Sequence, residues 1–534
     1  TETDANGNTT SYEYDGLGNL TKETDAKGFF TTFEYGVRDP AVTDPDDPGY
    51  LVCRDQLSKA TYPNGSVTVY EYDISRDANG LHRCNRIKET RDDGGLNLIS
   101  AWEYDDRGLM TLERDPNGHE TTHDYDTAGN RIKTTDAEAN ATRYAYDDAA
   151  NRTCMVDGNG HVTVYEYDAL DRLIRETAKI GTVIDPTDPI GPACTPADAD
   201  DIITAEYEYD GNDNQTLVRR QSNTSEPREW QVTTYEYDDR HRLVKETQDP
   251  GGLDLMTTYA YDGNDNRIAT TDPRGLTTTF EYDDQNRLTK VTDALIYETG
   301  YSYDPVGNRI EEIDANGHRT CSQYDELNRL TVQIRKMGPT SCALAASDDL
   351  VTRHFYDSGA DISCDHDPGS PQCDGPMPGG SNIASMIDPE GKVTYYKYDK
   401  LDRRWITIRK VGDTADACDP AGDPNEQDWC EYTKYDPADN VVARIDANDN
   451  RTDMVYYDND WLLSETQDPG GLDLVTSYTY DGAGNVATVT TPRGNVIYNT
   501  YDERDQLVKV EDIVSDPLPP YDLVAAYAYD GIGN

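Results

Sequence analysis

A tyrosine followed by an aspartate recurs along the whole chain of 534 residues, and this repeat constrains the fold more than any other feature. Successive copies are 21 residues apart from Tyr104 to Tyr167 and again from Tyr261 to Tyr324, and insertions lengthen the interval elsewhere. Self-similarity at a fixed period is typical of repeat proteins, in which each unit packs on its neighbours. We therefore expect a single continuous array of about twenty repeats over residues 1–534.

One repeat unit contains the signals of a β-hairpin. Residues 4–25 read DANGNTTSYEYDGLGNLTKETD, in which two turns rich in Asp and Gly separate two segments of about seven residues rich in Thr and Tyr. Such segments are typical of β-strands, and Asn6-Gly7, Gly16 and Gly18 are residue types that tolerate positive φ in tight turns. The sequence thus predicts an all-β fold of tandem antiparallel β-hairpin repeats that join into one sheet.

Aromatic residues occupy alternate positions of the predicted strands. Side chains alternate across a strand, so residues two apart share a face. The position two before the repeated tyrosine is aromatic in fourteen of the twenty units, so stacked hairpins would align these rings in a structural ladder. Cross-strand pairs of this kind contribute roughly 0.2–1 kcal/mol each. The predicted ladder includes Tyr12, Tyr14, Tyr144, Tyr146, Tyr165, Tyr167, Tyr235, Tyr237, Tyr259, Tyr261, Tyr301 and Tyr303.

The return strand begins with Asn-Arg and then Leu or Ile, as in residues 286–288 and 308–310, and we expect this apolar side chain to pack beside the tyrosine face. Together with the Tyr-Asp period, the pattern resembles the YD repeats, also called Rhs repeats, over nearly the whole chain. That family includes bacterial Rhs toxins, insecticidal toxin complexes, wall-associated proteins and teneurins. The resemblance implies that the sheet spirals into a hollow β-shell or tube, which in many members encloses a toxic C-terminal domain.

The composition limits the partners of the chain. With 103 acidic against 48 basic residues, its formal net charge is −55, which disfavours binding to nucleic acid or to anionic membranes. Only 35% of the residues are apolar, and no run of about 18 of them is available to insert into a membrane. The chain opens and closes partway through a repeat, so we expect a segment of a larger protein that is secreted or displayed at the cell surface.

Five irregular segments rich in Pro, Gly, Asp and Cys interrupt the period, and we expect them to project as inserted loops. They lie near residues 36–65, 74–100, 179–205, 338–390 and 411–431. The ten cysteines lie in or beside these segments without a CxxC motif, which favours disulfides and an oxidising compartment. The candidate pairs, whose connectivity the sequence leaves open, are Cys418 with Cys430, Cys364 with Cys373, Cys53 with Cys84 and Cys321 with Cys342.

Two motifs are of types that bind metals in other proteins, but in this chain they are better explained as parts of a strand and of turns. Residues 119–123 spell HExxH, but on a strand the two histidines would lie roughly 13 Å apart, too far to share one zinc ion. The Asp-x-Asn-Gly turns lack the bidentate Glu of an EF-hand, and an Asp at a turn bonds its own backbone. We therefore predict no catalytic residues and no cofactor, and weak calcium binding by the Asp-rich turns stays open.

These features favour a non-enzymatic structural segment, with three roles open. The first is a β-shell or tube of a large extracellular protein that contacts other parts of the same protein or copies of itself and forms filaments; near-identical copies of QDPGGLDL at residues 248–255 and 467–474 suggest growth by duplication. The second is the cocoon of a polymorphic Rhs-type toxin, which encloses a C-terminal toxin. The third is a wall-associated or teneurin-like adhesin whose inserted loops bind surface glycans or proteins.

Overall fold

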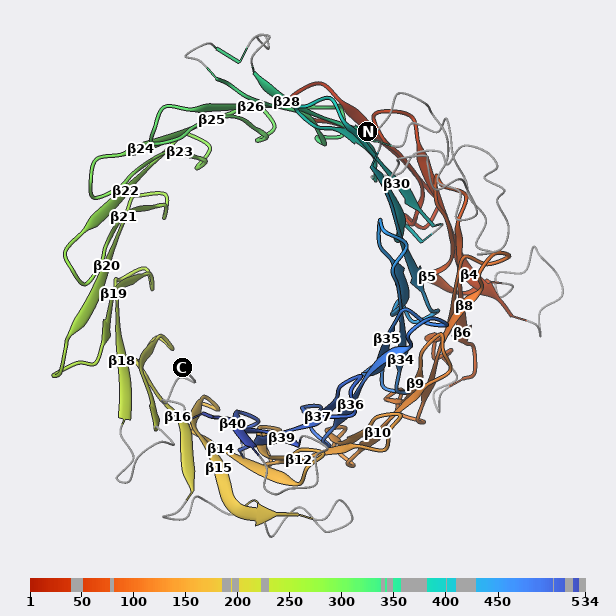
Figure 1. Ribbon diagram of the computed structural model, residues 1–534, viewed down its shortest axis with the longest axis vertical. Helices are drawn as coiled ribbons and strands as arrows, with labels where there is room; N and C mark the ends of the chain where they lie inside the picture. Colours follow the sequence, from red (N-terminus) through yellow and green to blue (C-terminus); the bar gives the residue numbers. More distant parts are fainter. Residues whose placement is uncertain are drawn as a thin grey trace. The chain divides into compact units, whose positions relative to one another are not determined.

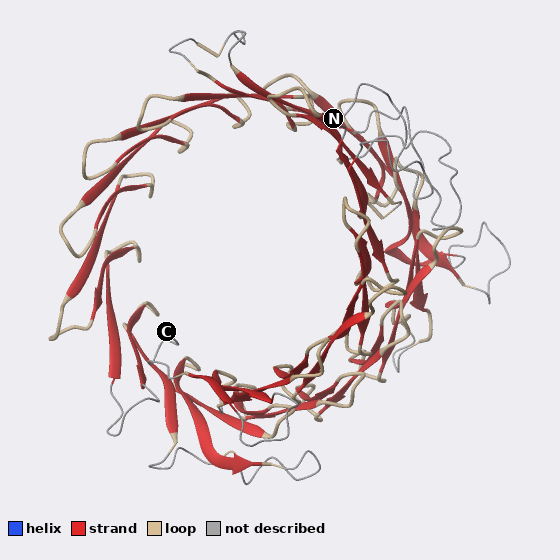
Figure 2. Ribbon diagram, viewed as in Figure 1, coloured by secondary structure: helices blue, strands red, loops and turns tan. Residues whose placement is uncertain are grey.

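The predicted all-β hairpin architecture is confirmed. Within the described part of the chain there is no helix, and forty strands belong to one antiparallel sheet (Figure 2). No described segment forms a helix able to cross a membrane. The computed structural model describes residues 1–39, 51–76, 81–184, 194, 201–221, 230–337, 341–342, 349–356, 382–399, 401–409, 429–502, 504–513 and 522–527.

The strands follow one another along the chain, and most pair with the next strand in sequence (Figure 1). They are β1 (Glu2–Thr3), β2 (Thr9–Tyr14), β3 (Leu20–Thr24), β4 (Phe30–Arg38), β5 (Leu51–Thr61), β6 (Val67–Asp73), β7 (Asn85–Arg91), β8 (Leu98–Tyr104), β9 (Met110–Arg114), β10 (Glu120–Tyr125), β11 (Arg131–Thr135), β12 (Ala141–Tyr146), β13 (Arg152–Val156), β14 (His161–Tyr167), β15 (Leu173–Val183), β16 (Ile202–Tyr209), β17 (Gln215–Gln221), β18 (Trp230–Tyr237), β19 (Leu243–Gln248), β20 (Leu255–Tyr261), β21 (Arg267–Thr271), β22 (Thr277–Tyr282), β23 (Leu288–Thr292), β24 (Glu298–Tyr303), β25 (Arg309–Ile313), β26 (Arg319–Tyr324), β27 (Leu330–Arg335), β28 (Leu350–Tyr356), β29 (Ile383–Ile387), β30 (Val393–Tyr398), β31 (Arg404–Arg409), β32 (Trp429–Tyr435), β33 (Val441–Ile445), β34 (Arg451–Tyr456), β35 (Leu462–Gln467), β36 (Leu474–Tyr480), β37 (Val486–Thr490), β38 (Val496–Tyr501), β39 (Leu507–Ile513) and β40 (Asp522–Ala526).

Each repeat is a hairpin with a β-bulge at its tyrosine, as β2 and β3 illustrate. Glu13 lies opposite Lys22, but Tyr14 lies opposite Leu20, so Thr21 is an extra residue on the return strand. The same register shift occurs at the repeated tyrosines of many other hairpins, including Tyr146, Tyr261 and Tyr303. A bulge bends and twists its strand, so its recurrence builds the same bend into successive repeats.

The turn that follows Tyr-Asp is closed by the aspartate itself. Asp15 Oδ1 accepts the backbone N–H groups of Leu17 and Asn19, each at 2.9 Å, and its Oδ2 accepts the Asn19 side-chain amide at 2.9 Å. Gly18 has a φ of 94°, a conformation that glycine adopts without steric cost. The hydrogen bonds from Asn19 lower the pKa of Asp15. Both oxygens of this carboxylate therefore accept hydrogen bonds from the turn itself.

The irregular segments begin as lengthened hairpin arms. β4 and β5 remain paired as far as Val37 opposite Val52 and Arg38 opposite Leu51, and β15 extends to Val183. Parts of the segments predicted as loops are therefore strands. Their backbone groups continue to hydrogen-bond across the hairpin, so an insertion can lengthen both arms before it leaves the sheet.

The chain divides into two compact units, and each combines early with late repeats. Unit 1 comprises Thr1–His119, Asp283–Val291 and Tyr297–Asp453, and unit 2 comprises Glu120–Tyr282, Thr292–Ile296 and Met454–Asn534. Apart from Leu98, the buried apolar residues that the structure describes are small or β-branched, as in the cluster of unit 2. That cluster consists of Cys154, Val156, Val162, Val164 and Ile184, all at most 7% exposed.

Candidate functional site

The repeated tyrosine joins each hairpin to the preceding one. The Tyr303 hydroxyl donates to the backbone carbonyl oxygen of Leu288 at 2.7 Å, and burial raises the pKa of this tyrosine. A buried phenol needs such a partner, so the aromatic ring and its hydrogen bond together fix the spacing of successive hairpins. The same bond is made by Tyr72, Tyr104, Tyr146, Tyr167, Tyr209, Tyr237, Tyr261, Tyr282, Tyr324, Tyr356, Tyr435, Tyr480 and Tyr501.

An arginine at the end of the Tyr-Asp turn makes a second contact between neighbouring hairpins. The Arg242 Nε and Nη2 groups donate to Asp238 Oδ2 at 2.8 and 2.6 Å, and its Nη1 donates to the carbonyl oxygen of Asp262 in the next turn at 3.0 Å. The guanidinium also lies 4.7 Å from the ring of Tyr261. The hydrogen bond from Arg242 lowers the pKa of Asp238 to about 2. Equivalent arginines are Arg172, Arg287, Arg329 and Arg403.

The twelve tyrosines of the predicted ladder all lie on strands and are half-buried, except that Tyr14 is 60% exposed. Guanidinium groups lie between successive rings. Arg152, for example, lies 5.9 Å from the ring of Tyr144 and 4.7 Å from that of Tyr165. Cation–π contact therefore contributes to the stacking, at roughly 0.5–1 kcal/mol for each exposed contact. Sequence reasoning missed this role, although an arginine at the start of the return strand was the available signal.

Among pairs whose two cysteines are both described, three disulfides connect the inserted segments to the sheet. Two are pairs that the cysteine positions suggest, Cys53 with Cys84 and Cys321 with Cys342, which are 31 and 21 residues apart. The third joins Cys154 to Cys194, a pair that the sequence did not indicate. Cys430, in β32, is disulfide-bonded. The other predicted partners, Cys418, Cys364 and Cys373, lie outside the described residues.

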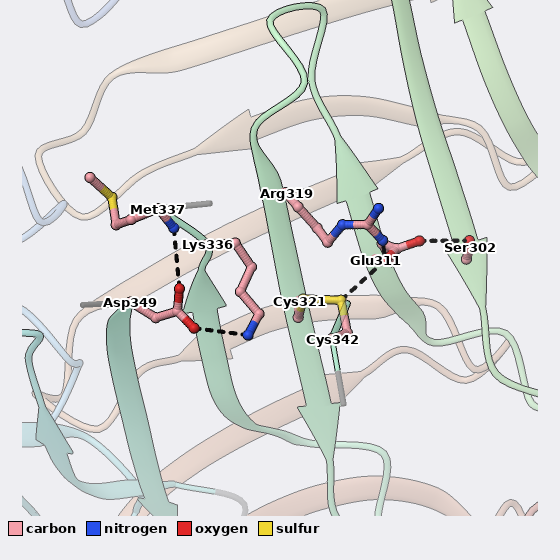
Figure 3. The surroundings of a disulfide bond; sticks show 8 residues. All are labelled: Ser302, Glu311, Arg319, Cys321, Lys336, Met337, Cys342 and Asp349. Atoms are coloured by element: carbon pink, nitrogen blue, oxygen red, sulfur yellow. Dashed lines mark hydrogen bonds and ion pairs between the residues drawn. A yellow bond between two sulfur atoms is a disulfide. The ribbon is translucent and has the colours of Figure 1, made fainter. Parts of the chain in front are cut away.

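A buried ion pair lies beside the Cys321–Cys342 disulfide (Figure 3). The Lys336 ammonium lies 2.8 Å from Asp349 Oδ2, and their side chains are 0% and 1% exposed. The second oxygen, Asp349 Oδ1, accepts the backbone N–H of Met337 at 3.2 Å. A second buried pair, Lys179 with Asp201 at 2.8 Å, lies at the base of another inserted segment. Each pair thus holds the two ends of an insertion together.

Four of the five residues of the HExxH sequence lie on a strand, and His119 immediately precedes it. Glu120 and His123 belong to β10, and His123 Nδ1 lies 3.2 Å from the hydroxyl oxygen of Thr134. The group of Glu311, Cys321 and Cys342 has metal-ligand spacing, but its two sulfurs form a disulfide.

Within each unit, turns of early repeats contact turns of repeats 298 to 348 residues later. The early turns are those inside a repeat, whereas the late turns follow Tyr-Asp. In a strand-turn-strand meander these two kinds of turn lie at opposite ends of the strands and form two rows, which we call the edges of the sheet. The contacts therefore join one edge to the other. We call this line of contacts the seam: Asn6–Asp304, Lys27–Asp325, Arg91–Asp439 and Asn117–Asp436 in unit 1, and Glu138–Asp458, Asp136–Asn459 and Asn159–Gly482 in unit 2.

Most of these seam contacts pair a carboxylate with an N–H donor. Asn6 Nδ2 donates to Asp304 Oδ2 at 3.1 Å, and the Lys27 ammonium donates to Asp325 Oδ2 at 2.7 Å. At the Asn159–Gly482 contact the two backbones almost touch, because a Cβ placed on Gly482 would lie 2.3 Å from the carbonyl oxygen of Gly158. The seam is therefore polar and closely fitted.

The Asp325 carboxylate of the Lys27–Asp325 contact is expected to stay ionised at acidic pH. Burial alone would raise the pKa of Asp325, but hydrogen bonds from Arg329 and Lys27 outweigh it and lower the pKa to about 2. A depressed carboxyl pKa stabilises the folded state at pH values above the unfolded pKa of about 4, and this contribution is lost as the pH falls towards the folded pKa. We expect an NMR titration to show Asp325 ionised at pH 3. A midpoint near 4, unchanged in the Lys27→Met variant, would contradict the contact.

The chain is similar to known proteins in its repeats and in its fold. The RHS Repeat family matches residues 1–39, 104–141, 256–295, 456–496 and 480–512. No curated protein sequence matches the chain. Among solved structures, the fold is similar to TcdB2-TccC3 without its hypervariable C-terminal region, with a TM-score of 0.58, 14% identity, and coverage of 95% of this chain and 26% of that one.

Two further structures have the same fold. The Photorhabdus luminescens Tc holotoxin pore gives a TM-score of 0.53 at 14% identity, covering 95% of this chain and 27% of that one. TcdB2-TccC3-TEV gives 0.55 at 14% identity, covering 98% and 30%. The chain thus spans less than a third of each solved chain, and these likenesses concern the fold. The RHS Repeat model thus matches five segments of a chain whose tyrosines recur every 21 residues, and the chain resembles the RHS-repeat proteins in repeat pattern and fold.

Proposed function

We propose that this chain is a non-enzymatic wall segment of an RHS-repeat shell that encloses another polypeptide. The seam is the observation that carries the proposal. In both units the two edges of the sheet meet after roughly the same interval, 298 to 348 residues in unit 1 and 320 to 323 in unit 2. A ribbon whose edges meet at a regular interval winds upon itself, and a winding ribbon can form a wall.

The side-chain contacts between neighbouring repeats support a mechanical role. Tyrosine hydroxyls, arginine side chains and disulfides hold neighbouring repeats at fixed spacing. Disulfides form in oxidising compartments, which supports a secreted or surface location. The net charge of −55 favours solubility and disfavours association with nucleic acid or anionic membranes. The partners in this proposal are other parts of the same protein and an enclosed C-terminal segment.

Electron microscopy of the purified native protein tests the proposal. We expect closed hollow particles whose contents are protected from protease until the wall is unfolded. Long uniform fibres would overturn it in favour of an extracellular scaffold. Binding to a glycan array that disappears on deletion of residues 338–390, with no protected contents, would overturn it in favour of an adhesin.

A further inference from the structure

One contact at the seam of unit 2 brings two carboxylates and an imidazole together. Asp157 belongs to the turn before β14, His161 is the first residue of that strand, and Asp505 belongs to the turn before β39. One ligand atom from each of the three residues lies within 4.8 Å of the other two. Residues far apart in the chain therefore converge on one small volume, beside the close approach of Gly158 and Gly482.

The atoms that face one another at this point have few other partners. Asp157 Oδ1 accepts the backbone N–H groups of Asn159 and His161 at 2.9 and 2.8 Å, which leaves its Oδ2 directed at the imidazole. His161 Nδ1 is buried and lies 3.3 Å from that Oδ2, yet it makes no hydrogen bond with any residue that the structure describes. Asp505 uses one oxygen to accept the Asn485 amide at 2.8 Å.

The arrangement differs from the seam contacts of Asp304 and Asp325 and from the turn of Asp314–His318. The seam carboxylates of Asp304 and Asp325 meet N–H donors, whereas Asp157 meets a second carboxylate. Burial raises the pKa of Asp157, and the charge of Asp505 adds to the rise. In the equivalent turn Asp314–His318, the imidazole Nδ1 makes an ordinary hydrogen bond with Asp314 Oδ2 at 2.9 Å. In that turn the histidine bonds within its own turn, whereas His161 Nδ1 does not.

We propose that Asp157, His161 and Asp505 bind one divalent transition-metal cation of the zinc class, which ties the two turns together across the seam. A neutral imidazole with two carboxylates is a donor set that suits zinc. Two ligands on one tetrahedral zinc ion with bonds of about 2.0–2.2 Å lie roughly 3.4 Å apart, close to the 3.3 Å between His161 Nδ1 and Asp157 Oδ2. The cation also neutralises two carboxylates that otherwise repel each other.

This inference goes beyond the proposed function and does not depend on it. Zinc binding to the metal-stripped full chain is measured by isothermal titration for the native protein and for three variants. We expect His161→Ala and Asp505→Asn each to weaken one zinc equivalent about tenfold or more, whereas His318→Ala matches the native protein. Zinc should also slow amide hydrogen exchange at residues 157–161 and 504–506, and do so in His318→Ala but not in His161→Ala.

Several results would overturn the site. Unchanged zinc binding in His161→Ala would do so, and an unchanged Asp505→Asn variant would show that no ligand crosses the seam. Equal losses in His161→Ala and His318→Ala would indicate nonspecific binding by turns. If the variants do not fold, X-ray absorption of the zinc-loaded native chain decides: a shell with one imidazole nitrogen supports the site, and a shell of oxygen alone, or no bound zinc, rejects it.

Discussion

Replacing Asp349 with alanine is expected to lower the free energy of unfolding by about 3–5 kcal/mol. The Lys336 ammonium lies 2.8 Å from this carboxylate, and neither side chain is more than 1% exposed. Removing the carboxylate takes the nearest counter-charge from a buried ammonium, which costs more than the pair itself contributes. Urea unfolding with hydrogen exchange at β28 (Leu350–Tyr356) measures the loss, because this strand begins next to Asp349.

Two controls separate the buried charge from the loss of packing. The double variant Lys336→Met with Asp349→Leu replaces the pair by apolar groups and should recover most of the stability. Glu34→Ala removes an exposed partner, since Glu34 lies 2.9 Å from Lys59 with side chains 64% and 39% exposed, and should cost at most about 1 kcal/mol. A loss in Asp349→Ala no larger than that in Glu34→Ala would show that the pair is hydrated.

Local chemistry accounts for what the sequence predicts well. Each Asp-rich turn is specified by its own residues: Asp15 bonds the backbone of Leu17 and Asn19, and Gly18 supplies the positive φ. Alternation of side chains then places the tyrosines, and the fixed period repeats the arrangement. A hairpin array follows from contacts within about 20 residues, which one repeat contains.

The features that the sequence did not predict depend on geometry that no single repeat displays. Ile310 was expected to pack beside the tyrosines, but it is the extra residue of the bulge between Tyr303 and Arg309 and is 36% exposed. A period-two pattern cannot locate such an insertion. The seam joins residues such as Lys27 and Asp325, 298 positions apart, and depends on the bend that many repeats accumulate. The Asp157–His161–Asp505 site was hidden for the same reason.

Replacing Gly482 with alanine is expected to open the seam of unit 2 and to cost about 1–3 kcal/mol. The new Cβ would lie 2.3 Å from the carbonyl oxygen of Gly158, and the obstacle is backbone, so no side-chain rotation can relieve it. The two turns must separate, and the hydrogen bond from the Gly482 N–H to Asn159 Oδ1, now 2.6 Å long, is lost with them. Hydrogen exchange at residues 157–161 and 481–485 should accelerate, while exchange at β20 and β21 stays unchanged.

Gly263 provides a matched control, because it occupies the same position after Tyr-Asp and a Cβ there would meet nothing within 4 Å. Neither glycine has a positive φ, so alanine strains neither backbone. The two variants therefore differ only in the atoms that the new Cβ meets. Gly263→Ala should be neutral or stabilise the chain by up to about 1 kcal/mol, since alanine restricts the unfolded state. If both variants behave alike, the two turns do not touch in solution, and the evidence that the sheet winds upon itself in unit 2 is lost. A selective effect at Gly482 would instead show that edges more than 300 residues apart close against each other.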